Sequence, residues 1–129
     1  MPRRHQDWFS QAQRDLDAAN NSLANRNYEW AAFQAQQAAE KALKAALLFS
    51  NREERHHSVV QLLNEVQKFA EIPQPLTEAA RELDRHYIQT RYPNGFAEGY
   101  PAQYYDEKLA RECISHARNF VEFVDRIIA

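Results

Sequence analysis

Apolar residues recur every three or four positions along most of the chain, which is the period of an α-helix. The first stripe consists of Trp8, Ala12, Leu16, Ala19 and Leu23. It predicts a helix of about 20 residues with one buried face, and the sequence NRN at 25–27 predicts the turn after it. The segment from about Tyr28 to Ser50 is dense in Ala, Leu, Lys, Gln and Glu, which favour helix. Its small alanines indicate a long central helix that neighbours approach closely.

A third, shorter helix is predicted from Ser58 to about Ala70. It begins with SVVQ, which has the form of a capping box: Ser58 caps the helix and the Gln61 side chain reaches back. The prolines of IPQP at 72–75 end it, because proline cannot continue a helix.

Two more helices complete the pattern. Leu76 to about Ile88 carries an apolar stripe, and Asp106 is a suitable N-cap for a helix that runs to the chain end. Residues 93–105 hold both glycines and two prolines and predict a loop, which is aromatic enough to pack onto the body. We therefore predict one all-α domain over residues 1–129, an up-and-down bundle of about five helices with antiparallel neighbours.

Composition limits the possible functions. The chain has 16 basic and 18 acidic residues, so any contact with nucleic acid has to come from a local patch. Cys113 is the single cysteine; it lies on an apolar helix face and is expected in the core, with no disulfide and no cysteine zinc site. The charged N-terminal sequence is unlike a signal peptide, and no apolar run is long enough to span a membrane. These features predict a cytoplasmic protein without membrane, metal or cofactor partners.

Polar chemistry is concentrated at residues 81–92. The usual phosphate-loop, dinucleotide, zinc-protease and serine-hydrolase motifs are absent from the sequence, and the adjacent His56 and His57 fit a polar loop. The stretch RELDRHYIQTRY instead combines arginine, histidine and tyrosine. Its candidate site residues are Arg81, Arg85, His86, Tyr87, Arg91 and Tyr92.

Arg81 and His86 are the candidate catalytic pair. Neutral histidine can take a proton from an RNA 2′-hydroxyl, and arginine can hold the phosphate without a metal. On a regular helix the two side chains point about 140° apart. They converge only if the helix loosens near Tyr87 or if two copies face each other. The alternative is structural: Arg81 and Arg85 form ordinary surface ion pairs with Glu78, Glu82 or Asp84.

The chain resembles the HEPN family, the higher-eukaryote and prokaryote nucleotide-binding domain, over nearly its whole length. Residues 8–23 and 28–49 resemble the family's first two helices, and QQAAEKALK at 36–44 is the most specific part. HSVVQLL at 57–63 resembles the start of the third helix. LDRHYIQTRYPNG at 83–95 resembles a Leu-Asp-x-x-Tyr-Ile-x-Thr-Arg-Tyr-Pro-Asp signature of one prokaryotic subgroup, with Asn94 in place of the final aspartate.

The resemblance implies a helical homodimer. Many HEPN proteins are metal-independent endoribonucleases with an Arg-x4–6-His motif in a cleft across the dimer, and many act with a minimal nucleotidyltransferase as toxin–antitoxin pairs. Others only bind nucleotide. Arg81 and His86 match the spacing, whereas Glu82 after the arginine and Tyr87 directly after the histidine differ from the usual motif.

Three hypotheses follow. In the first, a homodimer binds nucleotide or RNA around residues 81–92, through Arg85, Tyr87, Arg91 and Tyr92. In the second, Arg81 and His86 cleave RNA. In the third, the chain is a non-catalytic interaction module that docks a nucleotidyltransferase. Arg91 has a separate structural alternative, in which it fixes the aromatic loop through backbone carbonyls.

Overall fold

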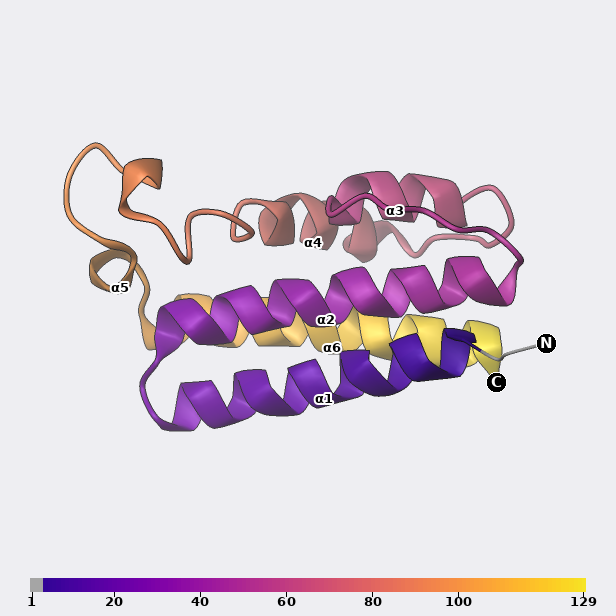
Figure 1. Cartoon of the computed structure of the whole chain (residues 1–129), viewed down its shortest axis with the longest axis horizontal. Coiled ribbons are helices and arrows are strands. Elements are labelled where there is room, and N and C mark those ends of the chain that lie inside the picture. The colour runs from indigo at the N-terminus through magenta and orange to yellow at the C-terminus, as the bar shows by residue number, and fades with distance from the viewer. Residues whose placement is uncertain (1–3) are drawn as a thin grey trace.

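The computed structural model describes residues 4–129, which fold into six α-helices and no strand (Figure 1). The helices are α1 (Arg4–Ala24), α2 (Tyr28–Phe49), α3 (Val59–Val66), α4 (Gln74–Asp84), α5 (Pro101–Tyr104) and α6 (Glu107–Ile128). A 3-10 turn, Pro93–Gly95, precedes α5. The predicted all-α bundle is confirmed, and the predicted aromatic loop contains this turn and the short α5.

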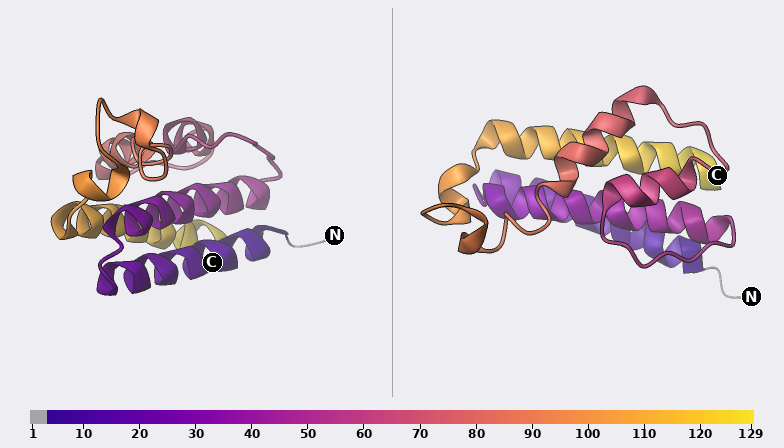
Figure 2. Two further views of the ribbon diagram at one scale, coloured as in Figure 1. Left: turned by 60° about the vertical axis from the view of Figure 1, so that its left-hand side comes forward. Right: turned by 90° about the horizontal axis from the view of Figure 1, so that it is seen from above.

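The three long helices α1, α2 and α6 form the body of the bundle. Helices α2 and α6 form a middle layer, with α1 on one side and α3 and α4 on the other (Figures 1 and 2). Helices α2 and α6 run in the same direction, so the expectation that all neighbours are antiparallel is wrong for this pair. The chain crosses back through α4 and the segment around α5 before α6 begins, and this return sets the parallel orientation.

Helix α2 is the centre of the core, as its composition predicts. Its fully buried alanines are Ala31, Ala32, Ala35, Ala38, Ala39, Ala42, Ala45 and Ala46. Because alanine adds little bulk, α1 and α6 pack closely against it, and larger residues such as Leu43, Leu83 and Phe120 fill the space between the layers. Cys113 is buried in the same core, and burial raises the pKa of its thiol to about 12.

Helix α4 ends four residues earlier than its apolar pattern predicts. The N–H groups of Arg85, His86 and Tyr87 bond to carbonyls three residues back, rather than four. This tighter bonding turns the chain out of the α-helix, and residues 85–91 follow as successive turns. Helix α3 likewise ends at Val66 instead of Ala70, and there the N–H groups of Lys68 and Phe69 bond to carbonyls three residues back.

Asp84 links the end of α4 to the start of α3. Its carboxylate accepts hydrogen bonds from the Ser58 hydroxyl (2.7 Å), the Val59 N–H (2.6 Å) and the Val60 N–H (3.1 Å). Ser58 caps α3 as predicted, since its Oγ accepts from the Gln61 N–H. The return bond predicted for the Gln61 side chain is not found among the described residues.

We predict that Asp84→Ala destabilises the protein by about 1–2 kcal/mol, because two N–H groups at the start of α3 lose a charged acceptor. Urea unfolding followed by circular dichroism measures this. The matched control is Asp125→Ala, an exposed aspartate of α6, which is expected to change the unfolding free energy by less than about 0.5 kcal/mol. Equal values for the two variants would contradict the capping role.

Candidate functional site

The structure does not bring Arg81 and His86 together within one chain. Arg81 is exposed in the last turn of α4. His86 lies past the helix end, is only 8% exposed, and its Nδ1 is 2.6 Å from the Tyr105 hydroxyl. Burial lowers the pKa of His86 to about 4. The helix does loosen after Asp84, but the turn carries His86 into the core.

Two of the three carboxylates expected beside the arginines, Glu82 and Asp84, have other partners. Glu82 contacts His116 of α6 at 2.5 Å, and Asp84 caps α3. Within residues 4–129, neither Arg81 nor Arg85 has a carboxylate within ion-pair distance, so the expected surface ion pairs are not formed. Both arginines are exposed.

Arg91 is the centre of a cluster of aromatic rings. Its Nε and Nη2 donate hydrogen bonds of 3.0 and 2.8 Å to the Tyr87 carbonyl. Its guanidinium carbon lies 4.4, 4.9 and 5.3 Å from the ring centres of Phe33, Tyr87 and Tyr92. Each distance is within the range of a cation–π contact. We call Phe33, Tyr87, Arg91 and Tyr92 the Arg91 cluster.

The Arg91 cluster unites three residues that the sequence marks as candidates. Arg91 bonds to a carbonyl of its own turn segment, so the expectation that it ties down the aromatic loop through backbone carbonyls is wrong. Thr90, the neighbour of Arg91 in the TRYP sequence, is buried and donates to the His86 carbonyl at 2.8 Å. Thr90 thus fixes the turn, while Tyr92 stays half exposed.

His57, in the loop before α3, connects the Arg91 cluster to polar residues of α2. Its ring stacks on Tyr87 with centres 5.2 Å apart and planes at 15°. Its Nδ1 is 3.2 Å from Oε2 of Glu40, and the same oxygen is 3.0 Å from the Lys44 ammonium. The Gln36 amide donates to the His57 carbonyl at 3.1 Å. The sequence pattern did not predict this network, although the predicted polar loop is where His57 lies.

The missed residues share one face of α2. Phe33, Gln36, Glu40 and Lys44 recur every three or four positions, and the last three are buried. A buried glutamate and lysine four residues apart in an alanine-rich helix indicate a polar network within the bundle. That spacing is the signal in the sequence that could have located it.

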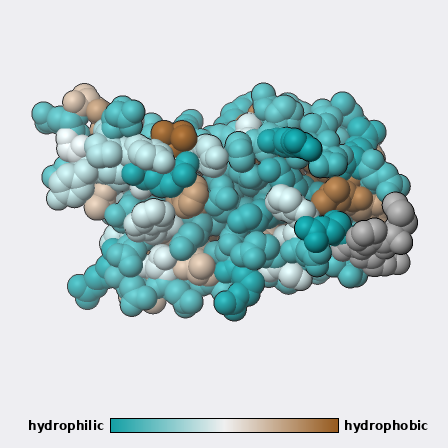
Figure 3. Space-filling model, viewed as in Figure 1, coloured by the Kyte–Doolittle hydropathy of each residue, from teal (hydrophilic) through white to brown (hydrophobic). Residues whose placement is uncertain are grey.

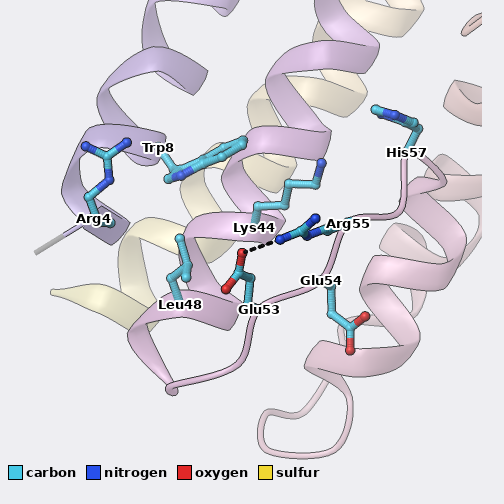
Figure 4. A pocket seen from close by; sticks show the side chains of 8 residues that line it. All are labelled: Arg4, Trp8, Lys44, Leu48, Glu53, Glu54, Arg55 and His57. Atoms are coloured by element: carbon cyan, nitrogen blue, oxygen red, sulfur yellow. Dashed lines mark ion pairs between the residues drawn. The ribbon is translucent and has the colours of Figure 1, made fainter.

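A pocket of about 510 Å³ adjoins this network at the end of α2 (Figure 4). Its lining residues are Arg4, Trp8, Lys44, Leu48, Glu53, Glu54, Arg55 and His57. Lys44 lies 5.4 Å from the Trp8 ring centre, and charges of both signs surround the opening. The face of the molecule in Figure 3 is mostly hydrophilic, with a few separate apolar patches. No described helix is long and apolar enough to cross a membrane.

The HEPN domain model matches residues 5–127, and the chain belongs to the HEPN family. It is 38% identical to TT1696 of Thermus thermophilus, whose crystal structure superposes with a TM-score of 0.95 over 98% of this chain and 99% of that one. ST0689, an archaeal HEPN homologue, is also 38% identical, with a TM-score of 0.83 and full coverage of both chains. A candidate toxin of Methanocaldococcus jannaschii, MJ1304, is 28% identical over 91% of this chain and 83% of its own.

Proposed function

We propose that this HEPN protein binds nucleotide or RNA at the Arg91 cluster, as a homodimer. The proposal is supported mainly by the surroundings of the Arg91 guanidinium. It donates two hydrogen bonds to the Tyr87 carbonyl and contacts three aromatic rings, of which the Tyr92 ring is half exposed. A base stacks on aromatic rings or on a guanidinium plane. The remaining N–H groups of Arg91 are suited to a phosphate.

The low net charge of the chain favours RNA binding at a local site rather than over the whole protein surface. The chain carries a net charge of −2, so long-range attraction of the whole protein to phosphate is weak. Affinity has to come from stacking and from the arginines of one segment, Arg85 and Arg91. Stacking on each aromatic ring is worth about 1–3 kcal/mol per base and tolerates different sequences.

The proposal includes a toxin–antitoxin setting, in which the protein works with a minimal nucleotidyltransferase. Membership of the HEPN family and the similarity to a candidate toxin support this setting. Cleavage of RNA by Arg81 and His86 remains the alternative for the same fold. It requires a second copy of the chain to complete the site, because one chain keeps the two residues apart.

We predict that Arg91→Ala weakens binding of a labelled single-stranded RNA about 5- to 150-fold, which corresponds to about 1–3 kcal/mol. Fluorescence anisotropy in EDTA measures the affinity, and light scattering gives the mass of the protein used. Arg118→Ala, which removes an exposed arginine of α6, is the matched control and is expected to leave the affinity within about twofold.

Two results would contradict the proposal. One is wild-type protein that binds neither RNA nor mononucleotides at low salt. The other is equal loss of affinity in Arg91→Ala and Arg118→Ala, which would show that binding depends only on total charge. RNA cleavage in EDTA that disappears in both Arg81→Ala and His86→Ala would instead support the alternative.

A further inference from the structure

The pocket at the end of α2 combines an apolar surface with cations. Trp8 comes from α1, Lys44 and Leu48 from α2, and Arg55 from the loop before α3 (Figure 4). Trp8 and Leu48 are partly exposed, so apolar surface lies beside two positive groups. The volume of about 510 Å³ is within the usual range of small-molecule sites. These features suit a small organic ligand.

Lys44 offers a shielded positive charge in this pocket. Its side chain is only 10% exposed. The ammonium has three donors; it gives a hydrogen bond of 3.0 Å to Glu40 and lies 5.4 Å from the Trp8 ring centre. Because Lys44 lines the pocket, an oxygen of a bound ligand can accept a further hydrogen bond. Such a bond is stronger away from bulk water, which favours an anionic oxygen.

Arg55 is paired only weakly within the chain. Its guanidinium is 3.9 Å from the Glu53 carboxylate, and the two side chains are 92% and 72% exposed. An ion pair of this length and exposure contributes little to stability. The carboxylate of a ligand can therefore replace that of Glu53 and accept two parallel N–H bonds from the guanidinium. Glu54, which also lines the pocket, contacts the His56 ring at 3.5 Å.

We propose that this pocket binds a small carboxylate with an aromatic or other apolar body. The acid group pairs with Arg55 and Lys44, and the apolar body packs against Trp8 and Leu48. The class of ligand follows from Glu53, because a carboxylate of the chain itself already pairs with Arg55 at this opening.

The balance of charge in the pocket favours a carboxylate over a phosphate. Lys44 is balanced by Glu40 at 3.0 Å, and Arg4 by Asp7 at the same distance. Once a ligand displaces Glu53, Arg55 supplies about one positive charge that has no strong partner. A carboxylate carries one negative charge, whereas a phosphate monoester carries about 1.5–2 near neutral pH.

This site is separate from the Arg91 cluster and does not depend on RNA binding there. His57 is the link between the two regions, since it lines the pocket and stacks on Tyr87. The acid group and the apolar body of the proposed ligand both contact residues outside the Arg91 cluster.

The test uses Trp8 as a fluorescent reporter. The chain has two tryptophans, and Trp30 is 46% exposed on α2, so Trp30→Phe leaves Trp8 as the single tryptophan. We predict that benzoate changes the Trp8 emission with a saturable curve. Acetate lacks the ring and benzamide lacks the charge, and each should bind at least about tenfold more weakly. In Trp8→Phe the Trp30 emission should stay constant.

Two variants in the Trp30→Phe protein should change the affinity for benzoate in opposite directions. Arg55→Gln should weaken binding roughly 3- to 10-fold, because the acid group loses its main partner. Glu53→Gln should tighten binding roughly 2- to 5-fold, because a competing carboxylate is removed. The matched controls are Arg111→Gln and Glu107→Gln, which form an exposed pair of α6 and should leave the affinity within about twofold.

Three results would overturn the inference. The first is a Trp8 emission that does not respond to benzoate, and the second is an affinity that is equal in Arg55→Gln, Glu53→Gln and the protein with neither change. The third is binding of inorganic phosphate or AMP at Trp8 as tight as that of benzoate, which would indicate a general anion site. None of these results bears on RNA binding at the Arg91 cluster, which is measured separately.

Discussion

Replacing Glu40 by alanine is expected to destabilise the fold by about 3–5 kcal/mol, the usual cost of removing one partner of a buried ion pair. Lys44 would be left 8% exposed without a counter-charge. The amides of Gln36 and Gln37 would also lose their contacts with Glu40 Oε1, which are 3.3 and 3.4 Å long. Urea unfolding followed by circular dichroism gives the change directly.

Two controls define the origin of the loss. Glu107→Ala breaks an exposed pair with Arg111 at 2.8 Å and should cost less than about 1 kcal/mol. The double variant Glu40→Leu, Lys44→Leu replaces both charges by apolar groups and should recover much of the lost stability, because no single charge stays buried. A loss below about 1 kcal/mol in Glu40→Ala would mean that the pair is not buried in solution.

Acid is expected to destabilise the protein specifically through His86. Burial lowers the pKa of this residue from 6.5 to about 4, so the folded state resists protonation that the unfolded state accepts. The stabilising contribution is present above pH 6.5 and is lost as the pH falls toward 4. The difference in pKa corresponds to about 3 kcal/mol.

The measurement compares the free energies of unfolding of the wild type and His86→Asn between pH 7 and pH 4. Other acidic and basic groups affect both proteins alike, so the difference between them isolates His86. Wild type should lose about 3 kcal/mol more than the variant over this range. Parallel curves would show that His86 is accessible to solvent in the folded protein and would favour its candidate role in catalysis.

Local sequence signals predicted the helices and their caps well. Apolar periodicity located every long helix, and Ser58 and Asp106 cap helices as their side-chain chemistry indicates. The end of α4 was not predictable from the same pattern. Its last turns depend on contacts with distant segments: Asp84 with the start of α3, and His86 with Tyr105. The spacing of apolar residues along one helix carries no information about contacts between residues about 20 positions apart.

The candidate site was also predictable from the sequence only in part. Tyr87, Arg91 and Tyr92 are close in sequence, and the turn that unites them lies within one segment. Phe33 and His57 come from α2 and from the loop before α3, and only the packing of these elements places them beside Tyr87. The spacing of Arg81 and His86 suggested a pair, but the turn after α4 directs the two side chains to different environments.

Nuclear magnetic resonance titration with a short single-stranded RNA tests whether RNA binds at the Arg91 cluster, because it reports where the ligand lies on a folded protein. We predict that amide and side-chain signals shift together and saturate with one affinity for the residues of the Arg91 cluster and its neighbour, namely Phe33, His57, Tyr87, Arg91 and Tyr92. Shifts confined to α1 and the outer face of α6, with the Arg91 cluster unchanged, would contradict it.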